Sequence, residues 1–284
     1  MSAPSVLLRC ADQVLELSVP VVMGVLNVTP DSFSDGGRFL SADAAVEQGL
    51  RMAAEGAALI DVGGESTRPG AEAVSVEEEL RRVIPVIERL RAATHAVISI
   101  DTSKPEVMQA AAAAGAGLVN DVRALREPRA LAAAAASGCA VCLMHMQGEP
   151  RTMQLAPHYT DVVREVRAFL AGRAAACRGA GFSADRLAVD PGFGFGKTVE
   201  HNLTLLRNLS ELAADGLPVL VGLSRKSMLG TLTGRAPEER RAGSVALAVI
   251  AALNGARIIR AHDVAPTVDA LKVAAAVVAG GRAA

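Results

Sequence analysis

The sequence predicts an α/β protein folded as a single closed (β/α)8 barrel, and two observations lead to this prediction. Short aliphatic or β-branched runs alternate eight times with longer segments of helical spacing that are rich in Ala, Leu, Glu and Arg. No Pro-rich or Ser-rich linker separates one unit from the next. Since α/β barrels often extend over roughly 200 to 250 residues or more as one domain, we assign the whole chain, 1–284, to one domain.

The predicted elements follow one another in a regular order along the chain. The strands are the runs at 21–26, 58–62, 97–100, 118–119, 140–144, 187–189, 219–221 and 257–259. Helical spacing is clear at 41–55, 75–93, 105–114 and 159–178. Ser75 marks a helix start, because three glutamates follow it in the first turn. Residues 6–17, with Ala11 and Asp12 at their centre, predict a hairpin in an N-terminal extension, 1–19, outside the barrel.

The composition excludes several classes of protein. There are 29 Lys and Arg against 30 Asp and Glu, a net charge of -1, whereas a nucleic-acid-binding protein usually has a clear basic excess. Hydrophobic residues make up 51% of the chain, enough for a large core. No apolar run approaches the roughly 18 residues of a membrane span, and residues 1–13 do not resemble a signal peptide. We therefore expect a cytoplasmic protein that binds neither nucleic acid nor membrane.

The four cysteines, Cys10, Cys139, Cys142 and Cys177, are too few for a disulfide framework at this length. Cys139 and Cys142 form a C-x-x-C, which could indicate a redox or zinc site. No second C-x-x-C and no spaced His pair accompanies them, and they lie in the apolar run CAVCLM. We therefore interpret them as buried strand residues.

A polar residue stands at or just after the end of every predicted strand. These residues are Asn27, Asp61, Asp101, Asn120 with Asp121, His145, Asp190, Ser224 with Lys226, and Arg260 with His262. Any one of them could be a helix cap or a turn former. Since all strand ends of a (β/α)8 barrel face one mouth, where such enzymes have their active sites, the complete set predicts a shared site.

The segment DPGFGFGKT, 190–198, resembles a phosphate-binding loop without being one. A P-loop needs a glycine where Pro191 stands, and a G-x-G-x-x-G needs one where Lys197 stands. We interpret its glycines as a flexible loop in which the backbone approaches its neighbours closely.

Seven segments together resemble the dihydropteroate synthase family. They are MGVLNVTPDSFSDGG (23–37), DVGGESTRPGA (61–71), SIDTSKPEVM (99–108), LMHMQGEPRTMQ (143–154), DPGFGFGKT (190–198), VGLSRKSMLG (221–230) and RAHDV (260–264). The resemblance runs in order from about residue 21 to residue 267, with no departure at the motif positions. It implies a (β/α) barrel that joins 6-hydroxymethyl-7,8-dihydropterin diphosphate to p-aminobenzoate and releases diphosphate in folate synthesis.

The resemblance implies a pterin site whose chemistry suits the residues present. A pterin presents a donor edge beside acceptor atoms, so its site needs carboxylates and donors. The implied pterin-binding residues are Asp101, Asn120, Asp190 and Lys226, with Met144 and Phe195 as apolar walls. Simpler interpretations are a salt bridge from Asp101 to Lys104, a cap at Asp190, and ordinary core packing for the two apolar residues.

The departing diphosphate needs positive charge and hydrogen-bond donors. The resemblance assigns this role to Thr67, Arg68, Arg260 and His262, and the last two follow strand eight, where barrels commonly bind phosphate. It also implies Mg²⁺ as the cofactor, held by the oxygen of Asn27, a residue that would otherwise be read as a turn former. We expect the catalytic side chains to be Lys226, Arg260, His262 and Asp101.

The implied p-aminobenzoate contacts are Phe33, Asp35, Pro69 and Ser227, although several of the polar residues at 31–35 could simply form turns. The glycine- and proline-containing loops 29–39 and 64–73 are predicted to close as lids. No side chain needs to be a nucleophile, because the substrate amine can attack directly. We favour a dissociative route in which a dihydropterin ring nitrogen helps to expel diphosphate before the amine attacks.

Two other functions and one assembly prediction remain. The chain could be a pterin-binding module of a methyl-transfer system or a catalytically silent paralogue. The cationic residues of the diphosphate site argue against the first, and the complete set of site residues argues against the second.

The segments 244–253 and 271–279 are apolar on almost every face, which predicts a homodimer.

Overall fold

The computed structural model describes residues 6–28, 38–66, 73–149 and 152–279. Its eight parallel strands form a closed barrel in the order β10-β3-β4-β5-β6-β7-β8-β9, which confirms the predicted fold class. The barrel strands are β3 (Val21–Asn27), β4 (Leu59–Gly63), β5 (Val97–Asp101), β6 (Leu118–Asp121), β7 (Ala140–Met144), β8 (Leu187–Asp190), β9 (Val219–Gly222) and β10 (Ala256–Ala261). Every predicted strand is present, with its ends shifted by at most two residues.

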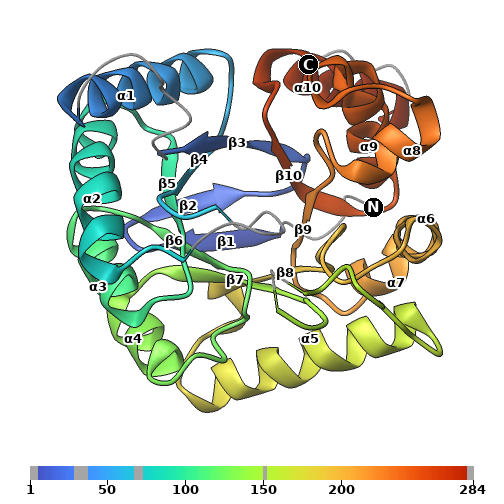
Figure 1. Cartoon of the computed structure of the whole chain (residues 1–284), viewed down its shortest axis with the longest axis horizontal. Helices are drawn as coiled ribbons and strands as arrows, with labels where there is room; N and C mark the ends of the chain where they lie inside the picture. Colours follow the sequence, from blue (N-terminus) through green and yellow to red (C-terminus); the bar gives the residue numbers. More distant parts are fainter. Residues whose placement is uncertain (1–5, 29–37, 67–72, 150–151, 280–284) are drawn as a thin grey trace.

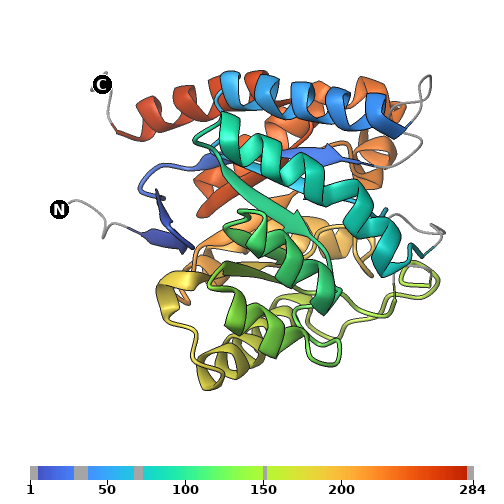
Figure 2. The same cartoon turned by 90° about the vertical axis from the view of Figure 1, so that its left-hand side faces the viewer.

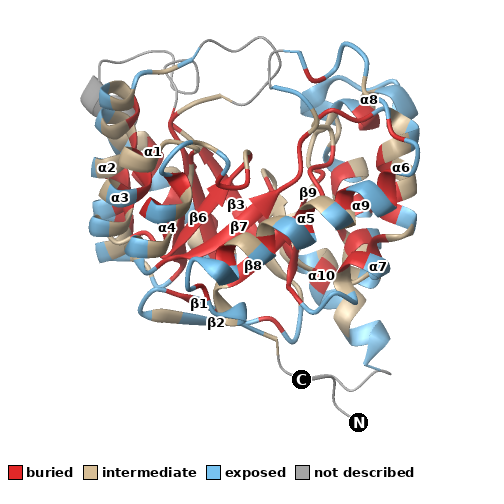
Figure 3. Cartoon of the chain, turned by 90° about the horizontal axis from the view of Figure 1, so that it is seen from below, coloured by how far each residue is buried: buried red, intermediate tan, exposed pale blue. Residues whose placement is uncertain are grey.

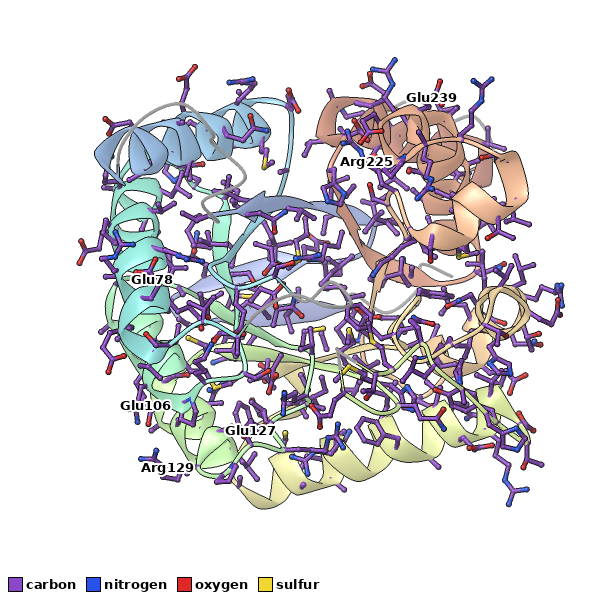
Figure 4. The ribbon with its side chains drawn as sticks, viewed as in Figure 1. Glu78, Glu106, Glu127, Arg129, Arg225 and Glu239 are labelled. Atoms are coloured by element: carbon purple, nitrogen blue, oxygen red, sulfur yellow. The ribbon has the colours of Figure 1, made fainter. Side chains whose placement is uncertain are left out.

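The helices surround the strands, as Figure 1 shows. They are α1 (Arg38–Ala54), α2 (Val76–Ala93), α3 (Pro105–Ala113), α4 (Ala130–Ser137), α5 (Val162–Gly179), α6 (Val199–Arg207), α7 (Leu209–Ala213), α8 (Ser227–Thr233), α9 (Arg241–Leu253) and α10 (Val264–Val278), with short 3-10 turns at η2 (Ala184–Arg186) and η3 (Pro237–Glu239). Ser75 caps α2 by accepting a hydrogen bond from the Glu78 N–H at 3.2 Å, as its position before three glutamates predicts. Glu78 and Glu106 lie at the perimeter of the ring (Figure 4).

The side chains of each strand alternate between the barrel interior and the helices. At the amino ends of the strands, the interior positions form one apolar cluster: Met23, Leu59, Val97, Leu118, Ala140, Cys142, Ala188, Leu220 and Ile258. The outward positions, such as Ile60, Ile98 and Val141, belong to a separate, larger cluster shared with the helices. Cys139 belongs to this outer cluster, so the two cysteines of the C-x-x-C pack into different cores.

The predicted hairpin closes the amino end of the barrel. Its strands β1 (Leu7–Cys10) and β2 (Gln13–Glu16) pair antiparallel, and Leu8, Cys10 and Leu17 belong to the apolar cluster inside the barrel. Figure 3 shows the hairpin beneath this end of the strands, and Figure 2 shows it at the left of the barrel. The amino end is therefore sealed, so a site that needs access from solvent has to lie at the carboxyl ends.

The next interior layer toward the carboxyl ends is polar. Two residues along each strand from the apolar layer, the interior positions carry Asp61, Ser99, Asn120, Asp190 and Arg260. Four of these, Asp61, Ser99, Asn120 and Asp190, are at most 5% exposed. Polar side chains this deep inside a barrel require partners, because an unpaired buried polar group costs about 1–3 kcal/mol. Among the described residues, no helix is long and apolar enough to cross a membrane.

Candidate active site

Asp61 is the centre of the polar layer. One of its carboxylate oxygens accepts a hydrogen bond from the Ser99 hydroxyl at 2.6 Å. The other accepts from the Asn120 amide at 3.0 Å and from Nε of Arg260 at 2.6 Å. These four residues come from β4, β5, β6 and β10, so they meet only because the sheet closes between β10 and β3. Asp61 fixes the orientation of Asn120 and Arg260, two of the predicted site residues.

Arg260 joins Asp61 to a second carboxylate. Its Nη2 donates to Asp101 at 2.9 Å, and its side chain is 22% exposed. Burial and the nearby Asp61 carboxylate raise the pKa of Asp101, while Arg260 opposes this change. Burial lowers the pKa of Arg260, but the two carboxylates outweigh it, so the guanidinium stays charged. The alternative partner of Asp101, Lys104, instead pairs with Glu65 and Glu79.

Asp190 stands at the end of β8 and is 5% exposed. Its Oδ1 accepts a hydrogen bond from the Gly192 N–H at 2.7 Å. The turn-forming interpretation of Asp190 is therefore correct for one carboxylate oxygen, and the other is the oxygen that a ligand could use. Burial raises the pKa of Asp190 to about 6, while the Gly192 N–H lowers it. A carboxyl group with a pKa close to neutrality is typical of a functional site.

Lys226 follows β9 and precedes the first residue of α8. Its Nζ lies 4.2 Å from the centre of the Phe195 ring, a cation–π distance. Burial and Arg260 lower the pKa of Lys226 to about 8, against the opposing effects of Asp190 and Asp101. Phe195 packs against a cluster of Val122, Met144, Met146 and Met153. The predicted wall residues Met144 and Phe195 therefore lie together, and packing in this cluster accounts for part of their role.

The ends of β9 and β10 are tied to each other. The His262 N–H donates to the Ser224 hydroxyl at 3.2 Å, and His262 Nδ1 lies 3.0 Å from the same oxygen. Arg225, labelled in Figure 4, has a positive φ of 58° and forms a bidentate pair with Asp263 at 2.7 and 3.1 Å. These contacts fix the positions from which Lys226 and His262 extend.

Asn27 ends β3, the strand that pairs with β10, and lies in register with Asp101. It pairs with Gly63 across the sheet, and Gly63 pairs with Asp101. A Cβ at Gly63 would lie 3.8 Å from Asp101 Oδ2 and 3.9 Å from Asn27 Oδ1. The glycine therefore leaves space between side-chain oxygens of β3 and β5, the two strands that flank β4.

The structure brings most of the predicted residues to one end of the barrel. Asp101, Asn120, Asp190, Lys226, Arg260, His262, Met144, Phe195 and Asn27 all stand at or near the carboxyl ends of the strands. Ser227 is exposed at the start of α8. Phe33, Asp35, Thr67, Arg68 and Pro69 lie outside the described residues, as do most of the two predicted lid loops. Within the described ranges, no group of three or more His, Cys, Asp or Glu side chains could hold a metal ion.

The sequence pattern left two important residues without a role. In the sequence, Asp61 is only a polar residue at the end of a strand. It lies on the same strand face as Leu59 and Gly63, and a carboxylate on this face already indicates a polar layer inside the barrel. Asp121, also fully buried, organises its loop, because it accepts hydrogen bonds from Ser103 and from the backbone of Arg123 and Leu125. No signal in the sequence separates its structural role from the role expected of Asn120.

The barrel and its polar carboxyl-end layer define a pterin-binding enzyme, since residues 23–262 match the family model described as pterin binding enzyme. The chain is 57% identical to dihydropteroate synthase of Escherichia coli (strain K12) over 259 residues, 91% of this chain and 92% of that protein. The structure of Xanthomonas albilineans dihydropteroate synthase with 4-aminobenzoic acid has a TM-score of 0.92 at 59% identity, covering 97% of this chain and 99% of that one.

A second structure of the Xanthomonas albilineans enzyme, in complex with 7,8-dihydropteroate, has a TM-score of 0.88 at 56% identity and covers 96% of this chain and 99% of that one. The chain belongs to the dihydropteroate synthase family.

Proposed function

We propose that this chain transfers the pterinylmethyl group of 6-hydroxymethyl-7,8-dihydropterin diphosphate to the amine of p-aminobenzoate. The bond between the methylene carbon and the diphosphate oxygen breaks, a carbon–nitrogen bond forms, and the amine loses one proton. The products are 7,8-dihydropteroate and diphosphate. The observation that carries this proposal is the buried carboxylate, amide and cation set at the carboxyl ends of the barrel, in a chain 57% identical to a dihydropteroate synthase.

The polar layer suits recognition of a pterin by its edges. The free oxygen of Asp190 can accept hydrogen bonds from the 2-amino group and the ring N–H, while Asn120 and Lys226 can donate to the ring acceptors. Asp101 supplies a second carboxylate, held in place by Arg260. Hydrogen bonds to a charged group in a buried site are worth about 1.5–3 kcal/mol each, more than apolar contact alone supplies to orient a flat ring.

Arg260 and His262 are the proposed diphosphate ligands, together with Thr67 and Arg68. Arg260 is on the eighth strand of the barrel, counted from β3, and His262 directly follows it. Barrels commonly bind phosphate at the carboxyl ends of their seventh and eighth strands. A fixed guanidinium stabilises the departing group increasingly as negative charge develops on its oxygen. The polar layer thus joins the pterin end of the site to the diphosphate end through one side chain, Arg260.

The residues present fit a Mg²⁺ ion bound mainly through the substrate. Magnesium favours oxygen ligands, keeps several waters and takes few protein ligands besides phosphate groups. Asn27 Oδ1 beside the space at Gly63 is an oxygen donor of this kind. When bound, Mg²⁺ would neutralise charge on the diphosphate. Asn27 then holds the leaving-group end of the substrate at the mouth.

The mechanism needs no nucleophilic side chain. The lone pair of a dihydropterin ring nitrogen helps to expel diphosphate, and the amine captures the resulting cation. The residues of the site bind and orient the pterin and exclude water from the cation. Ser227, exposed at the start of α8, and Phe33, Asp35 and Pro69 are the proposed contacts to p-aminobenzoate.

Diphosphate release without the amine tests the dissociative route. The enzyme with pterin diphosphate and Mg²⁺ alone should release diphosphate slowly, because water captures the cation when p-aminobenzoate is absent. Adding p-aminobenzoate should accelerate release and convert the pterin to dihydropteroate. A continuous diphosphate assay with and without the amine measures both rates. Release that depends absolutely on p-aminobenzoate would favour direct displacement.

A homodimer is the proposed assembly. Val273 and Val277 on α10 are 66% and 75% exposed, and Ile250 and Leu253 on the adjacent helix α9 are also exposed. Light scattering at micromolar concentration should give twice the chain mass of 29.2 kDa. The double variant Val273→Asp and Val277→Asp should be monomeric, because two charges in an apolar interface oppose association. A mass near that of one chain for the unmodified protein would refute the dimer.

We also propose that the enzyme is cytoplasmic. All four cysteines, Cys10, Cys139, Cys142 and Cys177, are buried and free. Free thiols are usual in a reducing compartment.

A further inference from the structure

The loop between β8 and α6 packs its backbone directly against the end of β7. Gly192 has a φ of 69°, and a Cβ there would lie 1.9 Å from the His145 carbonyl oxygen. Gly196 has a φ of 61°, and its Cβ would lie 2.4 Å from the Gln147 carbonyl oxygen. Only glycine can adopt these conformations at such short range. The predicted close approach is confirmed, and it brings several carbonyl oxygens to one buried point.

Lys197 places its ammonium group at that point. Its Nζ lies 2.9 Å from the Gly192 carbonyl oxygen, 3.1 Å from that of Phe195 and 3.5 Å from that of His145. The imidazole Nδ1 of His145 is a fourth neighbour, at 3.0 Å. The residue is only 3% exposed. An ammonium group has three N–H donors, so these neighbours satisfy it completely.

The charges around Lys197 show that this is an unusual position for a lysine. Among the described residues, no carboxylate lies within ion-pair distance of its Nζ. Burial lowers the pKa of Lys197 to about 7. Asp190 acts in the opposite direction and raises this pKa, whereas Lys226 lowers it further. Burial and Lys197 lower the pKa of His145 to about 3, which favours a neutral imidazole whose Nδ1 can accept a hydrogen bond from Lys197. A lysine amine buried without an ion pair is costly to keep protonated, and its contacts with three carbonyl oxygens offset part of that cost.

Two of the three residues whose carbonyls Lys197 binds, Gly192 and Phe195, also contact residues of the proposed pterin site. The Gly192 N–H donates to Asp190 Oδ1 at 2.7 Å. The Phe195 ring lies 4.2 Å from Lys226 Nζ. A turn hydrogen bond from the Phe195 N–H to the Gly192 carbonyl oxygen at 3.1 Å joins the two. A shift of this turn would therefore move a carboxylate, an aromatic ring and a cation of the site together.

We infer that Lys197 is a positioning residue for pterin binding: its ammonium group holds the 192–195 turn in the conformation that orients Asp190 and the Phe195–Lys226 pair. This inference rests on the proposed function of the same site. It also assigns a role to the lysine of the DPGFGFGKT segment, which binds carbonyl groups of its own chain where a P-loop lysine would bind phosphate.

The test is Lys197→Met, which keeps the length of the side chain and removes the donors. The dissociation constant of pterin diphosphate, measured by calorimetry with the full chain, should rise at least tenfold, and its KM should rise with it. The KM of p-aminobenzoate should change less than twofold. Lys197→Gln, which retains two amide donors, should lose less affinity than Lys197→Met and serves as the test if the methionine variant does not fold.

Arg186→Met is the matched control. Arg186 also donates to a backbone carbonyl, that of Cys139 at 2.7 Å, and lies over an aromatic ring, that of Phe182 at 4.7 Å. It stands at the amino end of β8, the opposite end of the barrel. Its replacement should lower stability, as Lys197→Met is also expected to do, and leave the pterin dissociation constant within twofold of the unmodified value.

A double-mutant cycle identifies the path of the effect. Phe195→Leu removes the ring that Lys197 helps to place, so the pair Lys197→Met and Phe195→Leu should lose less affinity than the product of the two single losses. Three results would overturn the inference. They are affinity losses that multiply independently in the double variant, an unchanged dissociation constant in Lys197→Met, and a loss of affinity in Arg186→Met equal to that in Lys197→Met. If the unmodified chain binds no pterin diphosphate, the proposed function fails; if it binds and Lys197→Met binds equally well, only the role of Lys197 fails.

Discussion

Arg260→Met is expected to lower the unfolding free energy by about 3–5 kcal/mol, the usual cost of removing one partner from a buried ion pair. The substitution leaves two carboxylates, Asp61 and Asp101, without the guanidinium that now lies 2.6 and 2.9 Å from them. Asp61 would keep its hydrogen bonds from Ser99 and Asn120. Among the described residues, no other hydrogen-bond donor contacts Asp101, so most of the penalty falls on it.

The loss should depend on pH in a definite direction. The pKa of Asp101 is already raised by burial and by Asp61, and without Arg260 it should rise further. Protonation then removes the uncompensated charge at low pH, so the destabilisation should be larger near pH 8 than near pH 5.5. Urea unfolding of the unmodified protein and of Arg260→Met at the two pH values measures this destabilisation.

Arg167→Met provides the control for the Arg260 experiment. Arg167 also pairs with two carboxylates, Asp215 at 2.6 Å and Glu211 at 3.4 Å, but all three side chains are well exposed. Its loss should cost no more than about 1 kcal/mol, as expected of surface pairs. An equal cost for both substitutions would show that the polar layer does not behave as a buried network.

Asp190→Asn is expected to weaken pterin binding by about 2 kcal/mol, roughly thirtyfold. The amide presents one acceptor and one donor group where the carboxylate presents two acceptors, so its NH2 group would face either the donor edge of the pterin or the Gly192 N–H with the wrong polarity. His262→Ala should instead weaken binding of the diphosphate group and spare a pterin that lacks it. Calorimetry with the two ligands separates these effects. If both variants lost affinity for the same ligand, the proposed division of the site would be wrong.

The affinity of the unmodified enzyme should also follow the ionisation of Asp190. Burial raises the pKa of this carboxyl group to about 6. Since the ionised form accepts the pterin hydrogen bonds, affinity should be nearly complete above about pH 7, reach half its full value near pH 6 and fall up to tenfold for each pH unit below that. Asp190→Asn should lack this part of the pH dependence. An identical pH profile in the variant would assign the titration to another group, including the ligand itself.

The strands could be predicted from the sequence because each one is an uninterrupted apolar run, as expected of parallel strands covered on both faces. The carboxyl ends were predictable for the same reason, since a polar residue ends each run. The helix boundaries were less exact: the predicted helix at 159–178 begins at Val162, because the Asp161 side chain caps it by accepting from the Arg164 N–H at 3.0 Å.

The contacts that organise the site could not be predicted, because they depend on closure of the barrel. Asp61 binds Arg260 across 199 positions of sequence, and only the pairing of β10 with β3 brings those strands together. Lys197 could not be interpreted for a related reason. Its partners belong to the ends of two neighbouring strands, β7 and β8, and no spacing in the sequence reports how closely those ends pack.

The most direct test of the central claim is dihydropteroate formation by the purified chain. Pterin diphosphate, p-aminobenzoate and Mg²⁺ are incubated with the unmodified protein, with Asp190→Asn and with Arg186→Met, and the product is measured by chromatography with mass detection. We expect product from the unmodified protein, a similar rate for Arg186→Met, and a kcat/KM for pterin diphosphate that is at least tenfold lower for Asp190→Asn. No product from the unmodified protein, or an unchanged kcat/KM in Asp190→Asn, would contradict a pterin-transfer site at the carboxyl ends of this barrel.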